Sequence, residues 1–218
     1  MKILFQGDSI TDGCRDYRNY HLMGNSYPKY ASALIAKEFP DVAFEFINQG
    51  IASNRTDNLF DRLYTDAIAF QPDVISILIG INDVWARYSS RVIETTDAQI
   101  EANYRAILER LKRQTNAKIV MLSPYLLDSE DKEYWRHELD RIQPMIRALA
   151  DEFADVFVPL HELFREALKT QPTPKFYSPD GVHPNANGAE FIGRKYYEAV
   201  LPLVKDCISS EKYQNKEI

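Results

Sequence analysis

The sequence of 218 residues has little cysteine and no long hydrophobic run. Its two cysteines, Cys14 and Cys207, are far apart and match no metal-ligand spacing, so reduced thiols are expected and no metal is called for. The apolar start Ile3–Phe5 soon meets a polar turn, too early for a signal-peptide core or a membrane span. We therefore expect no membrane insertion, and the cytoplasm is the expected location.

Charge of one sign is not concentrated anywhere in the chain. The formal net charge is −6, from 26 Lys and Arg against 32 Asp and Glu, without a long basic block. Nucleic acid is therefore not an expected partner, and a small neutral ligand fits better. With 45% hydrophobic residues and no visible linker or repeat, the length predicts one domain over residues 1–218, with a polar tail over 205–218.

Short apolar runs alternate with longer helical patterns. The runs, rich in β-branched or aromatic residues, are Ile3–Phe5, Val42–Ile47, Val74–Ile79, Ile119–Leu122 and Val156–Val158. Helical faces are formed by Ile100, Tyr104, Ile107, Leu108 and Leu111, and by Leu139, Ile142, Ile146, Leu149 and Phe153. Pro144 is expected to kink the second helix or to mark its first turn. The alternation predicts an α/β fold, with a mostly parallel five-stranded sheet of flavodoxin-like order covered by helices on both faces.

Polar turns containing glycine follow the first three runs. They read Gly7-Asp8-Ser9, Asn48-Gln49-Gly50 and Gly80-Ile81-Asn82-Asp83, and a fourth segment near the C-terminus reads Asp180-Gly181-Val182-His183-Pro184. Ligands of parallel sheets bind beyond the carboxyl ends of the strands, so the first three turns are expected at one edge. The loop Gln171–Pro179 is expected to carry the fourth segment to the same place.

A serine at such a turn requires a base, since its hydroxyl is a poor nucleophile at neutral pH. His183 is preferred because it occupies a constrained turn, and Asp180 can fold back onto its ring to set the tautomer. His161 reads as the start of an ordinary helix and His137 lies in a charged run, whereas His21, in a loop, stays open.

Acyl transfer also requires hydrogen-bond donors for the negative charge that develops on the attacked carbonyl oxygen. The candidates are the backbone N–H groups of Ser9 and Gly50 and the side-chain amide of Asn82. Gly50 has no Cβ and permits close approach of a substrate, and Asn82 donates without carrying a charge.

Together the four blocks resemble those of the SGNH hydrolases, or GDSL esterase/lipase family, from Phe5 to Pro184. The resemblance implies Ser9 as nucleophile, Gly50 and Asn82 as oxyanion donors, Asp180 with His183 as acid–base pair, a three-layer α/β/α fold and no cofactor. One departure is Ser53, which stands where the family often has a second glycine. The segment Ile79–Trp85 is similar to that of bacterial carbohydrate acetyl esterases, including acetylxylan esterases.

Plainer structural interpretations stay open for several side chains. Asp8 is interpreted as a helix cap, Arg55 as the partner of Asp57, and Cys14 as a structural thiol. Aromatic side chains that could line a sugar pocket, or pack in the core or between subunits, are Trp85, Tyr125 and Trp135.

The function predicted from these features is that of a serine esterase acting on short acyl esters, chiefly acetyl esters of carbohydrates. The expected partner is a small-molecule ester of an acylated sugar, and a homo-oligomer is expected. Alternatives are a lysophospholipase or thioesterase acting on longer chains, and a non-catalytic carbohydrate-binding protein with the same fold. A metal-dependent hydrolase is disfavoured, since no clustered ligand motif appears.

Overall fold

A five-stranded parallel sheet forms the middle of the molecule. The computed structural model describes residues 1–88, 95–127 and 132–210. The strands are β1 (Lys2–Gly7), β2 (Glu45–Gly50), β3 (Val74–Leu78), β4 (Lys118–Leu122) and β5 (Val156–Val158). They lie in the order β2-β1-β3-β4-β5, and every neighbouring pair is parallel. This is the flavodoxin-like order expected from the sequence, in which strand order reverses between β1 and β3.

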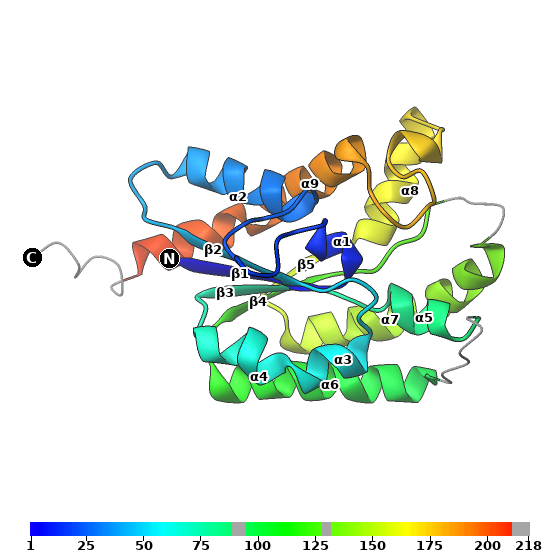
Figure 1. The fold of residues 1–218 in the computed structure, drawn as a ribbon, viewed down its shortest axis with the longest axis horizontal. Helices are drawn as coiled ribbons and strands as arrows, with labels where there is room; N and C mark the ends of the chain where they lie inside the picture. Colours follow the sequence, from blue (N-terminus) through cyan, green and yellow to red (C-terminus); the bar gives the residue numbers. More distant parts are fainter. Residues whose placement is uncertain (89–94, 128–131, 211–218) are drawn as a thin grey trace, which may run out of the picture.

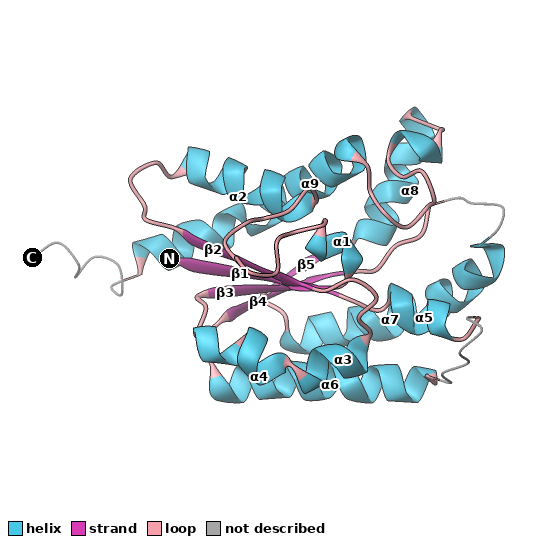
Figure 2. Cartoon of the chain, viewed as in Figure 1, coloured by secondary structure: helices cyan, strands magenta, loops and turns pink. Residues whose placement is uncertain are grey.

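Helices cover both faces of the sheet and complete the three-layer α/β/α arrangement (Figures 1 and 2). The layer drawn above the sheet contains α2 (Tyr27–Glu38), α8 (Leu160–Thr170) and α9 (Ala186–Ser209). The layer below contains α3 (Thr56–Asp61), α4 (Leu63–Asp66), α6 (Asp97–Gln114) and α7 (Glu133–Phe153). Shorter pieces are α1 (Ser9–Asp12), α5 (Ile81–Ala86) and the 3₁₀ turns η1 (Ile68–Phe70) and η3 (Pro174–Phe176).

The predicted helical faces pack against the sheet. Every member of the face predicted in α6 is buried, and Thr96 begins this helix with a capping box completed by Gln99. In α7 the face from Leu139 to Leu149 is buried and Phe153 is half-buried. Pro144 lies in the interior of α7, so the interpretation that it marks the first turn is wrong.

Two boundaries differ from the sequence prediction. Strand β2 begins at Glu45 rather than at residue 42, and it continues through Gly50, which pairs with Gly7 of β1. The predicted polar tail is also shorter, because α9 continues to Ser209. Buried Val204 and half-buried Ile208 hold its last turns on the core. Residues 211–218 of that tail lie outside the described residues.

The central strands are buried on both faces. Ile3, Leu4 and Phe5 are fully inaccessible, as is every residue of β3. Phe5 packs its ring against Tyr27 and Tyr196, which come from α2 and α9. Such two-sided burial leaves the carboxyl ends of the strands as the place where polar loops can reach solvent. Among the described helices, none is long and apolar enough to cross a membrane.

Candidate active site

Ser9 is the first residue of α1, directly after strand β1. The turn is tight at Gly7, where an added Cβ would lie 2.3 Å from the Leu78 carbonyl oxygen. Asp8 caps the helix, since its Oδ1 accepts a 2.9 Å hydrogen bond from the Ile10 N–H, and the interpretation of Asp8 as a cap is confirmed. The Ser9 N–H has no partner among the described residues and remains available as a donor.

A continuous chain of hydrogen bonds joins Ser9 to the fourth sequence block. Ser9 Oγ lies 3.0 Å from His183 Nε2, and His183 Nδ1 lies 2.7 Å from Asp180 Oδ2. The two ring nitrogens therefore have separate partners, one hydroxyl and one carboxylate. This geometry allows the imidazole to take the serine proton while the carboxylate holds the ring in orientation.

The Asp180 carboxylate is held by further donors from its own loop. Its Oδ1 accepts from the N–H groups of Val182 and His183, at 3.0 and 2.8 Å, and from Ser178 Oγ at 3.1 Å. Partial burial acts to raise its pKa, but the hydrogen bonds from the His183 ring, the His183 N–H and the Val182 N–H outweigh it and lower the pKa to about 2. Asp180 is therefore ionised throughout the neutral range.

The loop that carries Asp180 and His183 is fixed to the segment following β4. The Tyr125 hydroxyl donates to the Val182 carbonyl at 3.0 Å, and the Leu127 N–H donates to the Gly181 carbonyl at 2.8 Å. The Tyr125 side chain is only 1% exposed, so it follows the packing alternative and supports this loop instead of lining a sugar pocket. No sequence signal links Tyr125 with Val182, which lies 57 residues away.

Asn82 and Asp83, at the start of α5, both hold the loop that follows β2. One N–H of the Asn82 amide donates to the Asn54 carbonyl at 3.0 Å, which leaves the second N–H free to donate elsewhere. Asp83 accepts from the Thr56 N–H, at 3.1 Å to Oδ2, and from Thr56 Oγ1 at 2.7 Å. Burial raises the pKa of Asp83 to about 6, although both Thr56 hydrogen bonds oppose the rise.

The last residue of β2 and the loop that follows it offer two backbone N–H groups in different states. The Gly50 N–H donates to Asn48 Oδ1 at 2.9 Å, so a substrate would have to share this donor. An added Cβ at Gly50 would lie 2.2 Å from the Asp12 backbone nitrogen, so glycine is needed here for the close approach of α1. Ser53 has a φ of +64°, and its N–H has no partner among the described residues. No motif in the sequence predicts a role for the Ser53 N–H.

A cavity of about 390 Å³ opens beside Ser9 and His183, within the size range of small-molecule sites. Its other lining residues are Asp12, Gly13, Cys14, Asn25, Ser26, Ala52 and Pro184. The Asp12 carboxylate is held by the Tyr17 hydroxyl and by the Ala52 N–H, the latter at 3.0 Å. The predicted structural thiol of Cys14 is exposed and borders this cavity.

The other histidines have separate environments. His161 is buried, with Nε2 3.1 Å from Asp140 Oδ1, and lines a different cavity of about 320 Å³ that does not include Ser9. His21 places Nδ1 3.1 Å from the Phe46 carbonyl oxygen. No group of three or more His, Cys, Asp or Glu side chains suited to a metal ion occurs among the described residues.

The remaining candidates lie on α5, α7 and the residue before α3, and none of them lines the cavity at Ser9. Trp85, which is 41% exposed, lies on α5 three residues after Asn82. Trp135 is half-buried on α7, with the Lys132 ammonium 5.7 Å from its ring centroid. Arg55 pairs with Asp57 at 2.5 Å, as expected.

Fold and site together define an ester hydrolase of the α/β/α class. Residues 5–191 match the GDSL-like lipase/acylhydrolase family, and the chain belongs to that family. A curated relative, an acetylxylan esterase of Geobacillus stearothermophilus, is 30% identical over 207 residues, which are 91% of this chain and 93% of the relative.

Solved structures agree with this assignment. The crystal structure of the Geobacillus stearothermophilus acetylxylan esterase Axe2 has a TM-score of 0.82 at 29% identity, and the match covers 90% of this chain and 92% of that one. A GDSL-like protein from Parabacteroides merdae has a TM-score of 0.85 at 32% identity, with coverage of 90% and 94%. The present chain is therefore a carboxylic ester hydrolase of the GDSL type.

Proposed function

We propose that this protein is a serine esterase that removes short acyl groups, above all acetyl, from carbohydrate esters through an acyl-enzyme. The observation that carries the mechanism is the Ser9–His183–Asp180 chain of hydrogen bonds beside the unpartnered Ser9 N–H. Similarity to an acetylxylan esterase supports an acetylated sugar as the substrate. Assembly into a homo-oligomer and location in the cytoplasm stay predictions.

In the first half of the reaction, Ser9 Oγ attacks the ester carbonyl carbon while His183 Nε2 takes the hydroxyl proton. Asp180 stays ionised and stabilises the imidazolium that forms. The carbonyl oxygen becomes an oxyanion, for which the Ser9 N–H and the second N–H of Asn82 are donors. The Gly50 N–H is the third donor predicted from sequence, and the Ser53 N–H, which has no partner in the described part of the chain, is an alternative in the loop that follows. When this tetrahedral intermediate collapses, the bond between the carbonyl carbon and the sugar oxygen breaks. The sugar oxygen receives the proton from His183, and the sugar leaves as an alcohol.

The second half reverses these roles with water. His183 takes a proton from a water molecule that attacks the acyl-Ser9 carbonyl, and the same oxyanion donors stabilise the second tetrahedral intermediate. The bond to Ser9 Oγ then breaks, and His183 returns the proton to the serine. Acetic acid is released, and it ionises to acetate at neutral pH. Each turnover therefore consumes one water and leaves Ser9, His183 and Asp180 in their starting states.

The first experiment measures acetate released from acetylated xylo-oligosaccharides by the wild-type protein and by Ser9→Ala. A fall in kcat of about a thousandfold or more is expected for Ser9→Ala, because His183 Nε2 contacts no other nucleophile among the described residues. Ser32→Ala is the matched control, since the Ser32 hydroxyl donates to the Lys29 carbonyl within α2, away from Ser9 and His183 in the chain. Retained turnover in pure, folded Ser9→Ala would overturn the mechanism.

Substrate class is separated by parallel assays with aryl acetate and aryl octanoate. A strong preference for octanoate would favour a lysophospholipase or thioesterase over an acetyl esterase. Hydrolysis of aryl acetate without release from sugars would keep the serine mechanism and remove the carbohydrate assignment. Binding of xylo-oligosaccharides without hydrolysis of any ester would favour the non-catalytic protein.

A further inference from the structure

One arginine side chain joins three segments that surround the candidate active site. Arg62 is the residue between α3 and α4, and its side chain is only 14% exposed. Its Nη2 donates to the Gly7 carbonyl at 3.0 Å, its Nη1 to the Gln49 carbonyl at 2.7 Å, and its Nε to Asn54 Oδ1 at 2.7 Å. A single guanidinium therefore connects the end of β1, the end of β2 and the loop before α3.

Two of these acceptors adjoin backbone N–H groups that are candidate oxyanion donors. Gly7 lies two residues before Ser9, and Gln49 directly precedes Gly50. Gly7 and Gly50 are also partners in the register of β1 and β2. Arg62 therefore ties the two strands together at the point where the segments with the backbone donors begin.

The third acceptor leads to the two donors that lie farther along the chain. Asn54 directly follows Ser53, whose N–H has no partner in the described part of the chain. The Asn54 carbonyl accepts from the Asn82 amide at 3.0 Å, so Arg62 holds the side chain and Asn82 the backbone of the same residue. A shift of Asn54 would therefore move both the Ser53 N–H and the Asn82 amide.

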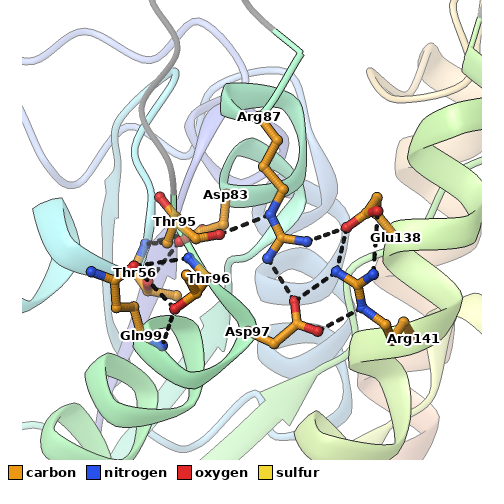
Figure 3. A network of polar contacts seen from close by, with 9 residues as sticks. All are labelled: Thr56, Asp83, Arg87, Thr95, Thr96, Asp97, Gln99, Glu138 and Arg141. Carbon is orange, nitrogen blue, oxygen red and sulfur yellow. Dashed lines mark hydrogen bonds and ion pairs between the residues drawn. The ribbon is translucent and has the colours of Figure 1, made fainter.

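A second set of bonds holds the other end of this loop to α5 (Figure 3). Thr56, the first residue of α3, donates from its N–H and its hydroxyl to Asp83 of α5. Arg87, directly after α5, pairs in turn with Asp97 at 2.6 Å and with Glu138 of α7. The loop is therefore held to a fixed α5 at one end, whereas the largely buried guanidinium holds it to the ends of β1 and β2.

The three donated bonds suit arginine and not lysine. A guanidinium has five N–H donors in a rigid planar fork, whereas lysine has one compact ammonium on a flexible stem. An ammonium in place of Arg62 could not bond at once to acceptors on three separate segments. The Asp66 carboxylate, 3.0 Å from Nη1, compensates the charge and adds no link to the site.

We propose that Arg62 is a positioning residue that sets the distances among the oxyanion donors and so acts on kcat. Arg62 does not itself line the cavity at Ser9. The proposal rests on the proposed serine esterase function and adds a residue to its machinery. Positioning is decisive for such donors, because each one is effective only at about 2.7–3.1 Å from the place that the oxyanion takes.

The first test compares aryl acetate hydrolysis by the wild type, Arg62→Lys and Asp66→Asn. Arg62→Lys should lower kcat roughly thirtyfold and change KM less than about threefold, because the donors stabilise the transition state more than the bound ester. Asp66→Asn removes the ion pair but keeps the three donated bonds, so its kcat should stay within about threefold of wild type. Arg105→Lys is the matched control, since Arg105 pairs with Glu152 and is 36% exposed.

A double-mutant cycle with Asn82→Ala distinguishes positioning from loss of folded protein. Arg62→Lys should cost at least about threefold less in Asn82→Ala than in the wild type, because one of the donors that Arg62 positions is already absent. Destabilisation would instead lower kcat by the same factor in both backgrounds, and this result would overturn the proposal. An unchanged kcat, or a loss confined to KM, in Arg62→Lys would overturn it too.

Asn54→Ala is the variant for the case in which Arg62→Lys does not fold. It removes one of the three acceptors of Arg62 and keeps the carbonyl that accepts from Asn82. Its kcat should fall about threefold to tenfold, and less in the Asn82→Ala background. An unchanged kcat in Asn54→Ala, or an equal loss in both backgrounds, would overturn the proposal.

Failure of the proposed function is recognised separately, as absence of ester hydrolysis by the wild type. In that case the donors are probed with phenylboronic acid. Its boron forms a bond to Ser9 Oγ while the serine proton passes to His183, and the tetrahedral boronate carries its negative charge at the oxyanion donors. Calorimetric titration should show binding weakened roughly tenfold in Arg62→Lys and unchanged in Arg105→Lys. Absence of binding to the wild type, or equal binding by the wild type and Arg62→Lys, would overturn the proposal.

Discussion

Two carboxyl groups close to Ser9 and His183, those of Asp180 and Asp8, have contrasting surroundings. Asp180, with 41% of its side chain exposed, accepts bonds from the His183 ring, two N–H groups and Ser178. Asp8 is 1% exposed; its Oδ1 accepts one N–H, and Oδ2 has no partner among the described residues. Partial burial acts to raise the pKa of Asp180, but its hydrogen-bond donors lower it to about 2, whereas burial raises the pKa of Asp8 to about 7. Surroundings, not residue type, decide which carboxyl is an anion that can orient a base.

Asp83 distinguishes the effect of burial on the pKa from that of hydrogen bonds, because it is buried like Asp8 but accepts several hydrogen bonds like Asp180. Its side chain is inaccessible and accepts from both the N–H and the hydroxyl of Thr56. Its pKa of about 6 is lower than that of Asp8. Hydrogen bonds thus compensate part of the cost of burial, and the three carboxyls form a series that substitutions can test.

The largest expected effect is the loss of the Asp180 anion. Asp180→Asn should lower kcat on the order of a thousandfold or more at pH 7, because the amide cannot stabilise the imidazolium and favours the wrong tautomer of His183. Steady-state hydrolysis of aryl acetate measures this, with Asp16→Asn as a surface control, since the Asp16 carboxylate pairs with the exposed Arg18 two residues later. A loss below tenfold would contradict the role given to Asp180.

Asp8→Asn should stabilise the protein at alkaline pH. The folded pKa of Asp8, about 7, exceeds the unfolded value of 3.8, so the folded state holds the extra proton and stability falls as pH rises from about 4 to 7. Removing the ionisable group should raise the free energy of unfolding at pH 8 by up to about 4 kcal/mol, with little change near pH 4. Urea unfolding at both pH values measures the difference, and a pH-independent difference would contradict this.

Asp83→Asn should stabilise the protein at alkaline pH by less than Asp8→Asn does. The folded pKa of Asp83, about 6, exceeds the unfolded value of 3.8 by less than that of Asp8, so its ionisation costs less stability as pH rises from about 4 to 6. The Asn amide also directs an NH₂ group toward the Thr56 donors, which leaves buried groups unpaired and costs about 1–3 kcal/mol. The gain in the free energy of unfolding at pH 8 should therefore be at least about 1 kcal/mol smaller than in Asp8→Asn. The same urea experiments apply, with Asp8→Asn as the matched comparison. If both variants were stabilised by the same amount, burial alone would determine the change in the free energy of unfolding. The hydrogen bonds from Thr56 would then have no measurable effect.

The smallest effect is expected for Ser178→Ala, which removes one of the donors to Asp180 and a 2.7 Å bond to the His183 carbonyl. The ring contact and both N–H donors remain, so kcat should fall about tenfold or less. The folded pKa of Asp180 should rise toward 3.8, which reduces the stability that this group contributes above pH 4 and that is lost as pH falls toward 2. Assays of kcat at pH 7 and unfolding at pH 2 to 5 measure both effects, and a loss equal to that of Asp180→Asn would show that Ser178 is indispensable.

The fold could be predicted from sequence because apolar runs alternate with helical segments along the chain, and each is recognised from residues that are close in sequence. Five apolar runs separated by helical segments fix the strand number, and the handedness of crossovers makes the strands parallel. Boundaries were harder to place, as at β2 and at the end of α9. The apolar Val42–Phe44 precedes the strand, and packing by Val204 and Ile208 extends a helix whose sequence there is mostly polar.

The candidate site was predictable to the extent that its residues lie in short blocks at strand ends. Each block has turn-forming residues next to a polar side chain that can take part in acyl transfer. This allowed the choice of Ser9, Asn82, Asp180 and His183. Contacts made across blocks could not be chosen in this way. The bond from Tyr125 to Val182 and the bond from the Asn82 amide to the Asn54 carbonyl depend on how loops meet in space.

The order of the reacting residues along the chain has a consequence for folding and synthesis. Ser9 follows the first strand, whereas its partner His183 lies 174 residues later, just before α9. On the ribosome the nucleophile therefore emerges 174 residues before the base. A nascent chain stopped after β5 could pair all its strands and still lack the base. Recovery of esterase turnover would then report a late event, the docking of α9 against α2, where Gly193 lets the helices approach so closely that an added Cβ would lie 2.5 Å from Tyr30.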